Sequence, residues 1–376
     1  MPQISVWEKE SFFAPQDIII IGSGYSGLWS ALFLKKLHPR KKITILERGI
    51  IPVGASTRNA GFSCFGSPTE LLSDMAAMSE DKMLKLVEMR FKGLAEIRKH
   101  FAAIKIDYDP CGGYECFTND KDIWETTISK IDWLNSKLKD ITNTNTTFNN
   151  ADKKISDFGF ANISHLIENK LEGSLHSGKL VQALQKKVLS AGVQILTGVE
   201  VINYTEKSNS VEIETPINTF TAKQLLLCTN AFTKQLMPDI DIIPNRGQVL
   251  LTEPIKELKI KGTFHFEEGY YYFRNVGNRL LLGGARNKAF EEETTTHMLT
   301  TDTIETTLKQ FIKTYLLPNT HFTIGDKWSG IMAMGSEKSP IVKAVTDKVF
   351  CCIRMSGIGV ALAPVVAQEI AQIMKR

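Results

Sequence analysis

The sequence predicts an α/β protein with more than one domain. Its 376 residues exceed what one hydrophobic core usually serves. Short apolar strands alternate with amphipathic helices, which is typical of a sheet covered by helices on both faces. The hydrophobic content of 43% and the charged content of 23% are those of an ordinary folded protein, so we exclude a disordered chain.

Charge and cysteine usage narrow the class of protein. The net charge of +4 is too small to indicate nucleic-acid binding. The six cysteines form no Cys-x-x-Cys pair, so we expect reduced thiols in a cytoplasmic protein. We expect no membrane contact, because no uncharged stretch could span a bilayer and the start of the chain lacks a signal-peptide pattern. No histidine has a metal-ligand spacing, so we expect no metal site.

The first predicted strand, 18–21, leads directly into a glycine turn and a helix. Gly22, Gly24 and Gly27 form a Gly-x-Gly-x-x-Gly motif, and the helix is expected to begin near Ser26. In this context the glycines allow a tight turn, close approach of the backbone to a pyrophosphate, and close packing of helix on strand. The start of the helix offers free N–H groups and a positive dipole end to phosphates.

The second predicted strand, 42–47, ends in an acidic residue. Glu47 lies at the spacing where a carboxylate accepts hydrogen bonds from an adenosine ribose. A carboxylate there also repels a 2′-phosphate, which disfavours NADP. The two strands, the motif and Glu47 together predict a Rossmann-like dinucleotide-binding domain.

Residues 54–62, GASTRNAGF, combine small side chains with two hydrogen-bond donors. The small residues let the backbone approach a flat ring, while Arg58 and Asn59 can donate to phosphate or ring carbonyls. The small residues are Gly54, Ala55, Ser56, Ala60 and Gly61.

Two long helices are predicted from apolar periodicity, over 81–101 and 122–141. Their stripes are core faces, formed by Met83, Leu86, Leu94, Ile97 and Phe101 in one and by Trp124, Ile128, Ile131, Leu134 and Leu138 in the other. The polar patch at 142–150, TNTNTTFNN, is expected to be a surface loop. Further strands are predicted at 193–204, 223–230, 270–275 and 279–285.

The chain resembles the FAD-dependent oxidoreductases of the D-amino acid oxidase, glycine oxidase and sarcosine oxidase superfamily, particularly amine-oxidising members related to gamma-glutamylputrescine oxidase. The resemblance implies a Rossmann-like FAD-binding domain and a substrate domain on a mixed or antiparallel sheet. It runs in order through the chain, at 5–8 (SVWE), 54–62, 172–201, 225–232, 243–253, 270–287 and 349–374.

The resemblance also implies which residues bind FAD. At 349–374 a second strand, glycine turn and helix aim another helix N-terminus at the flavin pyrimidine, where negative charge gathers on reduction. We expect this last helix to be buried beside FAD. The expected FAD-binding residues are Gly22, Gly24, Tyr25, Ser26, Gly27, Glu47, Arg48, Ala55, Ser56, Arg58, Asn59, Ala60, Gly61, Val199, Thr229, Asn230, Gly357, Ile358, Gly359 and Val360.

FAD is expected to be bound noncovalently. Some relatives attach the flavin through a cysteine or a histidine, but 328–336 contains no cysteine and 54–62 contains no histidine.

The expected catalytic residues are Tyr271, Arg274 and Met332. Strand alternation places Tyr270, Tyr272 and Arg274 on one face and Tyr271 on the other. The family alignment favours Tyr271 over the flavin, although a bulge could reverse this. An aromatic wall suits an amine substrate.

Two departures from the family bear on the substrate and the acceptor. Met332 stands where amino acid oxidases carry an arginine for the substrate carboxylate, so a simple α-amino acid substrate is in doubt. Whether Arg274 or Arg286 replaces that arginine stays open. Leu281 stands where some relatives carry a lysine that activates oxygen, so fast oxidase behaviour is in doubt.

The resemblance predicts discontinuous domains with the catalytic cavity between them. The FAD-binding domain is expected to comprise 1–85, 165–243 and 323–376, and the substrate domain 86–164 and 244–322.

The predicted function is oxidation of an amine or amino acid to an imine, by hydride transfer to flavin N5, with O2 as acceptor and H2O2 as product. Three alternatives stay open. They are a flavin dehydrogenase that uses a quinone or carrier, a flavin domain of the tRNA-modifying type, and a flavin-binding protein without turnover.

Overall fold

The computed structural model describes residues 3–375, which divide into two compact units. Unit 1 comprises the described residues up to Thr57, Gly178–Pro244, and those from Met332 onward. Unit 2 comprises Arg58–Ser177 and Asn245–Ile331. Each unit is discontinuous in sequence. Of the residues that we expected in the FAD-binding domain, 58–85, 165–177 and 323–331 lie in unit 2.

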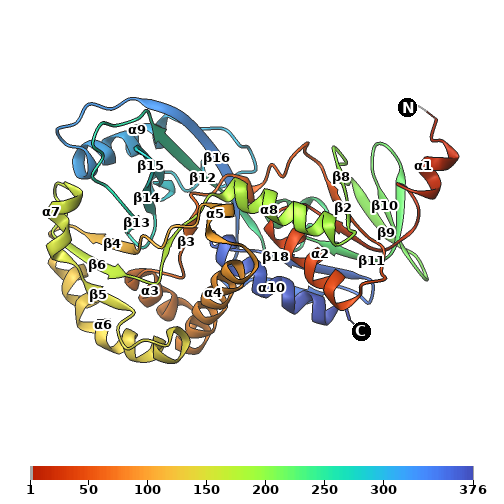
Figure 1. Ribbon diagram of the computed structural model, residues 1–376, viewed down its shortest axis with the longest axis horizontal. Helices are drawn as coiled ribbons and strands as arrows, with labels where there is room; N and C mark the ends of the chain where they lie inside the picture. Colours follow the sequence, from red (N-terminus) through yellow and green to blue (C-terminus); the bar gives the residue numbers. More distant parts are fainter. Residues whose placement is uncertain (1–2, 376) are drawn as a thin grey trace. The chain divides into compact units, whose positions relative to one another are not determined.

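Unit 1 is built on an eight-stranded sheet with the order β17-β18-β11-β1-β2-β8, and the β9–β10 hairpin extends it from β11 (Figure 1). The strands β18, β11, β1, β2 and β8 are mutually parallel, whereas β17 runs antiparallel to β18. The bounds are β1 (Gln16–Ile21), β2 (Ile43–Glu47), β8 (Gln194–Thr197), β9 (Asn203–Glu206), β10 (Val211–Glu214), β11 (Thr219–Leu227), β17 (Ile341–Ala344) and β18 (Val349–Ile353).

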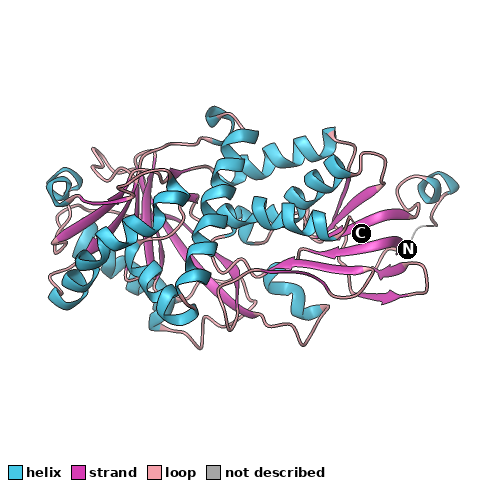
Figure 2. Ribbon diagram, turned by 90° about the horizontal axis from the view of Figure 1, so that it is seen from below, coloured by secondary structure: helices cyan, strands magenta, loops and turns pink. Residues whose placement is uncertain are grey.

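Two apolar helices pack against each other in unit 1, α2 (Tyr25–Leu37) and α10 (Gly359–Ile373). The expectation that the last helix is buried is confirmed, because α10 exposes little besides its polar residues. Figure 2 shows the strands of this sheet side by side near the two labelled termini, with helices packed over them. The other helical segments are α1 (Val6–Glu10), η1 (Ala55–Thr57), α8 (Ser177–Ser190) and η3 (Asn230–Gln235).

Unit 2 is built on a mixed sheet with the order β16-β12-β15-β14-β13-β4-β6-β5, in which β13 and β4 run parallel. A small second sheet pairs β3 with β7. The bounds are β3 (Phe62–Ser63), β4 (Gly113–Phe117), β5 (Phe148–Asn150), β6 (His165–Asn169), β7 (Gly173–Ser174), β12 (Ile243–Thr252), β13 (Thr263–Phe266), β14 (Tyr271–Val276), β15 (Arg279–Gly284) and β16 (Ile324–Met334).

The long helices of unit 2 confirm the predicted ones. α4 (Glu80–His100) and α6 (Lys121–Thr142) bury the predicted stripes, although Trp124 and Ile128 are only half-buried. The remaining segments are α3 (Pro68–Met78), α5 (Ala103–Ile106), η2 (Asp152–Lys154), α7 (Ile155–Phe158), η4 (Arg286–Lys288), α9 (Asp302–Phe311) and η5 (Ile312–Leu316).

Two local predictions need correction. The patch at 142–150 is not simply a surface loop, because Phe148 opens strand β5 and is buried, and the hydroxyls of Thr142 and Thr147 bond to each other at 2.9 Å. The free energy gained by burying the Phe148 ring holds this segment against the protein although its neighbours are polar. The strand predicted over 193–204 is broken, since 198–202 lies outside β8 and β9 and Gly198 has a φ of +72°.

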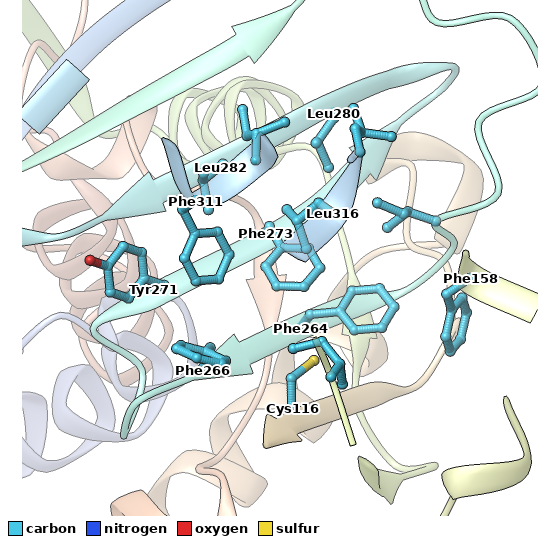
Figure 3. Packing of buried hydrophobic residues seen from close by; sticks show 14 of the residues in the cluster. Cys116, Phe158, Phe264, Phe266, Tyr271, Phe273, Leu280, Leu282, Phe311 and Leu316 are labelled. Carbon is cyan, nitrogen blue, oxygen red and sulfur yellow. The ribbon is translucent and has the colours of Figure 1, made fainter. Parts of the chain in front are cut away.

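An aromatic cluster forms the core of unit 2. Alternate residues of β13, β14 and β15 point to one face of the sheet and pack on α9 and η5, as Figure 3 shows. Phe264 and Phe273 stack with centroids 4.8 Å apart. The α/β class and the mixed sheet are therefore confirmed. Within residues 3–375, every helix is too short or too polar to cross a bilayer.

Candidate functional site

The glycine turn between β1 and α2 requires glycine at two positions. Gly22 has a φ of +100°, and a Cβ there would lie 2.8 Å from the carbonyl oxygen of Cys228. A Cβ on Gly27 would lie 1.9 Å from the carbonyl oxygen of Gly22. The helix therefore packs on the turn with no room for a side chain, as the motif predicts.

The start of α2 offers backbone donors. Gly24 is the N-cap residue and supplies no side-chain cap. The amide of Tyr25 donates to Ser56 Oγ at 2.9 Å, so the segment with Ala55 and Ser56 lies beside the helix start. Ser26 is buried in the first turn. Because first-turn amides have no intrahelical acceptors and the dipole end is positive, this end of α2 suits a phosphate.

Glu47 ends β2 as a buried carboxylate. Its Oε2 accepts hydrogen bonds from the amide and the hydroxyl of Ser23, both at 2.9 Å, and its Oε1 accepts one from the Gly49 amide at 3.0 Å. A carboxylate has about four acceptor positions, so Oε1 can take one more donor, such as a ribose hydroxyl. Val199 lies beside it, because its amide donates to the Glu47 carbonyl at 2.9 Å.

Arg48 and Thr229 have partners inside unit 1. The Arg48 guanidinium lies 3.9 Å from the ring centroid of Phe232, a cation–π contact. The Thr229 hydroxyl lies 2.9 Å from that of Thr233. These contacts fix the ends of β2 and β11, which lie at the carboxyl edge of the sheet, near the glycine turn.

The loop before α10 is backbone-strained. Arg354, Ser356 and Gly357 have φ values of +61°, +45° and +85°, a region that non-glycine residues rarely adopt. Asn230 holds the loop, because its Oδ1 accepts hydrogen bonds from the Arg354 and Met355 amides at 3.1 and 3.3 Å. In the described part of the chain, the buried Ser356 hydroxyl has no hydrogen-bond partner.

The start of α10 lies beside Met332. Ile358 is the N-cap residue, without a side-chain cap, and Gly359 and Val360 begin the helix. The Met332 sulfur lies 3.5 Å from where a Cβ on Gly357 would stand. Unit 1 therefore brings Met332 together with the second glycine turn, as the predicted site requires.

The segment 58–61 is tied to strand β16 and to the start of α8. Arg58 Nη1 donates to the Ser329 carbonyl at 3.0 Å, and Trp328 Nε1 donates to the Arg58 carbonyl at 2.9 Å. Asn59 Oδ1 accepts a hydrogen bond from Ser177 Oγ at 2.6 Å. Some of the groups expected to face a cofactor therefore hold the segment in place.

Arg274 also holds this segment. Its Nη1 donates to the carbonyls of Gly61 at 2.8 Å and Leu175 at 3.0 Å, with Ala60 at 3.4 Å. Gly61 has a φ of +73°, and a Cβ there would lie 2.2 Å from the Leu175 oxygen. Burial lowers the pKa of Arg274. These contacts favour a positioning role for Arg274 over contact with substrate.

Tyr271 lies in the apolar core of unit 2. It is 4% exposed and stacks on Phe311 with centroids 4.5 Å apart (Figure 3). Tyr272 points to the opposite face, where its ring lies edge-on to Phe62 at 6.0 Å. Like Ala60, it packs on the buried cluster of Val249, Leu251 and Leu281. Tyr271 therefore lies on the core face of the sheet, and the expectation that it lies over the flavin stays a prediction.

Strand alternation accounts for the different surroundings of Tyr271 and Tyr272. β14 pairs with β15 in a regular register without a bulge, so Tyr271 and Phe273 share the core face while Tyr272 and Arg274 share the other. Burial raises the pKa of Tyr271 and of Tyr272 to about 12, so both phenols stay protonated at neutral pH.

Arg286 is the second arginine considered for the substrate. Its guanidinium lies 5.2 Å from the Tyr270 ring and 5.4 Å from the Phe290 ring, and it donates weakly to Asn245 Oδ1 at 3.4 Å. Among residues 3–375 it makes no salt bridge. Burial raises the pKa of Tyr272, and the positive charge of Arg286 lowers it by a smaller amount. Arg286 is therefore a half-buried cation that could bind an anionic group.

The sequence did not single out His265. It is the cross-strand partner of Tyr272, and its ring lies edge-on to Phe62 at 5.2 Å. Burial lowers its pKa, and its Nε2 has no hydrogen-bond partner in the part of the chain described. The available signal was the pattern Phe264-His265-Phe266, because alternation points the histidine away from the face that the phenylalanines bury.

A dinucleotide fits the residues present in unit 1. The glycines of the turn from Gly22 to Gly27 have no side chains that would keep a ligand from the backbone at the start of the helix. Glu47 retains a free acceptor position, and the Ser356 hydroxyl lacks a hydrogen-bond partner among the described residues. Backbone donors for a pyrophosphate and a carboxylate for a ribose are the groups such a ligand needs.

Comparison with known families gives a match over nearly the whole chain. The family model described as DAO, FAD dependent oxidoreductase, matches residues 17–373. Among solved structures, the fold is similar to that of glycine oxidase from Bacillus cereus ATCC 14579, with a TM-score of 0.77 and 19% identity. The match covers 96% of this chain and 95% of that one.

Two curated proteins are similar in sequence. The chain is 23% identical over 388 residues to the "Probable oxidoreductase OrdL" of Haemophilus influenzae, covering 95% of this chain and 82% of that protein. It is 26% identical over 290 residues to the "Gamma-glutamylputrescine oxidoreductase" of Escherichia coli, covering 71% of this chain and 64% of that protein.

Proposed function

Because the chain belongs to the DAO family of FAD dependent oxidoreductases, we propose that it oxidises the C–N bond of an amine or amino acid to an imine. The name of the Escherichia coli relative, which specifies gamma-glutamylputrescine, supports an amine-bearing substrate. The observation that carries the proposal is the face of unit 2 where Tyr272 lies edge-on to Phe62, with the Arg286 cation, which makes no salt bridge within residues 3–375, close enough to lower the pKa of Tyr272.

FAD is the cofactor, and we assign it to the residues of unit 1. When bound, it supplies the oxidation by taking a hydride from the carbon beside the nitrogen onto flavin N5. The glycine turns at 22–27 and 357–359 would hold its phosphates and flavin, and Glu47 its ribose. Binding is proposed to be noncovalent.

Substrate binding is assigned to Tyr272 and Arg286 rather than to Tyr271 and Arg274. Tyr272 offers an aromatic wall that attracts an ammonium group and contacts the neutral amine. Arg286 offers planar donors to a carboxylate. The Nη1 of Arg274 is occupied by backbone carbonyls. In unit 1, Met332 lies beside the second glycine turn, and we assign it to the surroundings of the cofactor.

Two electron acceptors remain as candidates. O2, which would give H2O2, is the acceptor we propose first. A quinone or protein carrier is favoured by one observation, because Leu281 is buried against Tyr272 and puts no cation on that face.

The test of the substrate assignment is anaerobic mixing of the FAD-loaded protein with amines, amino acids and amines that carry a carboxylate, followed by flavin bleaching. We expect Arg286→Gln to weaken binding of carboxylate-bearing substrates roughly 10- to 100-fold, with little change for substrates without one. Tyr271→Phe is the matched control and should leave bleaching unchanged. Equal losses for both substrate classes would remove Arg286 from the site.

Arg274→Lys separates positioning from substrate contact. Lysine cannot replace the several bonds of a guanidinium to three carbonyls, so we expect unit 2 to lose on the order of 2 kcal/mol. Thermal unfolding should show this loss without substrate. An unchanged melting temperature together with a raised KM would instead assign Arg274 to the substrate.

Admission of air to the bleached protein tests the acceptor. Return of flavin colour with one H2O2 for each imine would support an oxidase. Slow return in air, with fast return after a quinone is added, would support the dehydrogenase.

A further inference from the structure

A basic groove lies in unit 1, at the edge of the sheet opposite the cofactor turn. It has a volume of about 310 Å³. The first residues of three parallel strands line it, Gln16 of β1, Ile43 of β2 and Gln194 of β8. Cofactors of such sheets bind at the carboxyl ends of the strands, where Gly22 and Glu47 lie. The groove is therefore separate from the proposed FAD site.

Four cations line the groove against one carboxylate. Lys35 comes from the end of α2, and Arg40, Lys41 and Lys42 precede β2, whereas Glu10 is the one acidic residue of the lining. Arg40 and Lys42 are exposed, and Lys35 and Lys41 are half-buried. Within the described residues, none of the four makes a salt bridge. Glu10 in the lining and the nearby Asp17, which interacts electrostatically with Lys41, offset only part of this charge, so the groove carries a net positive charge.

Exposed apolar side chains adjoin these cations. Helix α1 buries none of its residues, and Val6 is 53% and Trp7 76% exposed. Phe12, which lines the groove, is 53% exposed, whereas Phe13 beside it packs on Phe220 at 5.5 Å.

Local contacts hold α1 in shape. Ser5 and Glu8 form a capping box, with bonds of 2.7 and 3.2 Å, and the Ser11 hydroxyl donates to the Trp7 carbonyl. Trp7 therefore lies one helical turn, about 6 Å, from the groove residue Ser11. The short helix is preorganised although no part of the described chain covers it.

We propose that this surface docks on an anionic lipid bilayer. The groove cations would attract the lipid phosphates, while Trp7, Phe12 and Val6 would enter the headgroup region. Tryptophan and phenylalanine next to basic residues are the usual anchors of proteins that lie on a membrane. The proposed contact is peripheral, and it departs from the expectation of no membrane contact, which rested on the lack of a spanning stretch and of a signal-peptide pattern.

The apolar residues favour a bilayer over a soluble polyanion. A nucleic acid or an acidic protein would use the four cations, but nucleic acid gains little from an exposed valine and tryptophan at the rim. A bilayer uses both sets, since its surface combines negative charge with an apolar layer beneath. Each cation strengthens attraction only about fivefold, so binding is reversible and weakens with salt.

The test is sedimentation of the FAD-loaded full chain with vesicles of phosphatidylcholine alone and of phosphatidylcholine mixed with phosphatidylglycerol. We expect sedimentation with the mixed vesicles only. The double substitution Arg40→Gln/Lys42→Gln should lower the association constant for the mixed vesicles roughly 25-fold, and Trp7→Ala should lower it several-fold. The matched control is Ile104→Ala/Lys105→Gln, an exposed pair on α5 in unit 2, which should bind as the unchanged protein does.

Flavin content and thermal stability, measured on every variant, separate this proposal from the proposed function. Both should stay unchanged, because no substituted residue belongs to the cofactor or substrate residues. Equal sedimentation with both vesicle types, or an equal loss in the α5 control, would overturn the proposal. So would absence of vesicle binding together with retention on a nucleic-acid column that Arg40→Gln/Lys42→Gln abolishes, since that result assigns the groove to a soluble polyanion.

Discussion

At the scale of the residue, the cofactor turn depends on steric contacts that no other side chain permits. Gly27 and Gly54 provide a comparison within unit 1. A Cβ on Gly27 would overlap the Gly22 carbonyl, whereas a Cβ on Gly54 would meet nothing within 4 Å, and Gly54 has no positive φ. The same substitution should therefore be disruptive at Gly27 and neutral at Gly54.

We expect Gly27→Ala to separate α2 from the turn and to abolish stable FAD binding. The overlap should cost on the order of 3 kcal/mol of folding free energy. Gly54→Ala should leave flavin content and melting temperature within error. The measurement is flavin absorbance per polypeptide together with thermal unfolding. Normal flavin content in Gly27→Ala would show that the helix can shift without loss of the site.

At the scale of the element, two buried glutamates hold the segment that follows 58–61. Glu115 on β4 accepts hydrogen bonds from Ser67 Oγ and the Thr69 amide, both at 3.0 Å, at the start of α3. Glu172 accepts one from the Phe65 amide at 2.9 Å. These bonds favour the ionised form, but burial has the larger effect and raises the pKa of Glu115 to about 7 and that of Glu172 to about 8.

The raised pKa values predict a stability that falls as pH rises. In the unfolded chain both carboxyls titrate near 4.5, so the folded state binds more protons between about pH 4.5 and 8. The contribution to stability is fully present below the unfolded value and is lost as pH rises through the folded values. At about 1.4 kcal/mol for each pKa unit, the two raised values correspond to a loss of at most about 8 kcal/mol across this window.

Denaturant unfolding at several pH values checks this prediction. The double variant Glu115→Gln/Glu172→Gln should flatten the dependence, because neither amide titrates. Glu88→Gln is the control, since Glu88 is 45% exposed and pairs with Lys92 at the surface. If the double variant keeps the slope of the unchanged protein, other groups set the pH dependence.

At the scale of the whole molecule, FAD joins segments that are distant in sequence. The residues assigned to it come from the start of the chain, from Val199 to Asn230, and from the strand and helix at the end. A ligand that binds only the folded chain stabilises it in proportion to the logarithm of its concentration over Kd. Removal of FAD should therefore lower the stability of unit 1.

Acid precipitation tests how FAD is held. We expect all of the flavin to stay in solution when the polypeptide precipitates, because 54–62 lacks a histidine and 328–336 lacks a cysteine. The apoprotein should melt about 5 °C or more below the reloaded protein. Flavin that sediments with the polypeptide would show a covalent bond to another residue.

The sequence by itself determined the features that depend on local order. The turn from Gly22 to Gly27, the acidic end of β2 and the stripes of α4 and α6 follow from residues within a few turns of one another, so spacing alone predicts them. The resemblance to the family extended this to FAD and to a second domain on a mixed sheet.

Only the tertiary structure decided which side chains face which surface. Strand alternation separated Tyr271 from Tyr272, but packing against Phe311 decided which of the two is in the core. The carbonyls of 60–61 and 175 meet at Nη1 of Arg274, which supports the proposed positioning role, and Phe148 is buried despite its polar neighbours. The physical reason is that burial and hydrogen-bond partners come from segments far apart in the chain, whose approach no local spacing encodes.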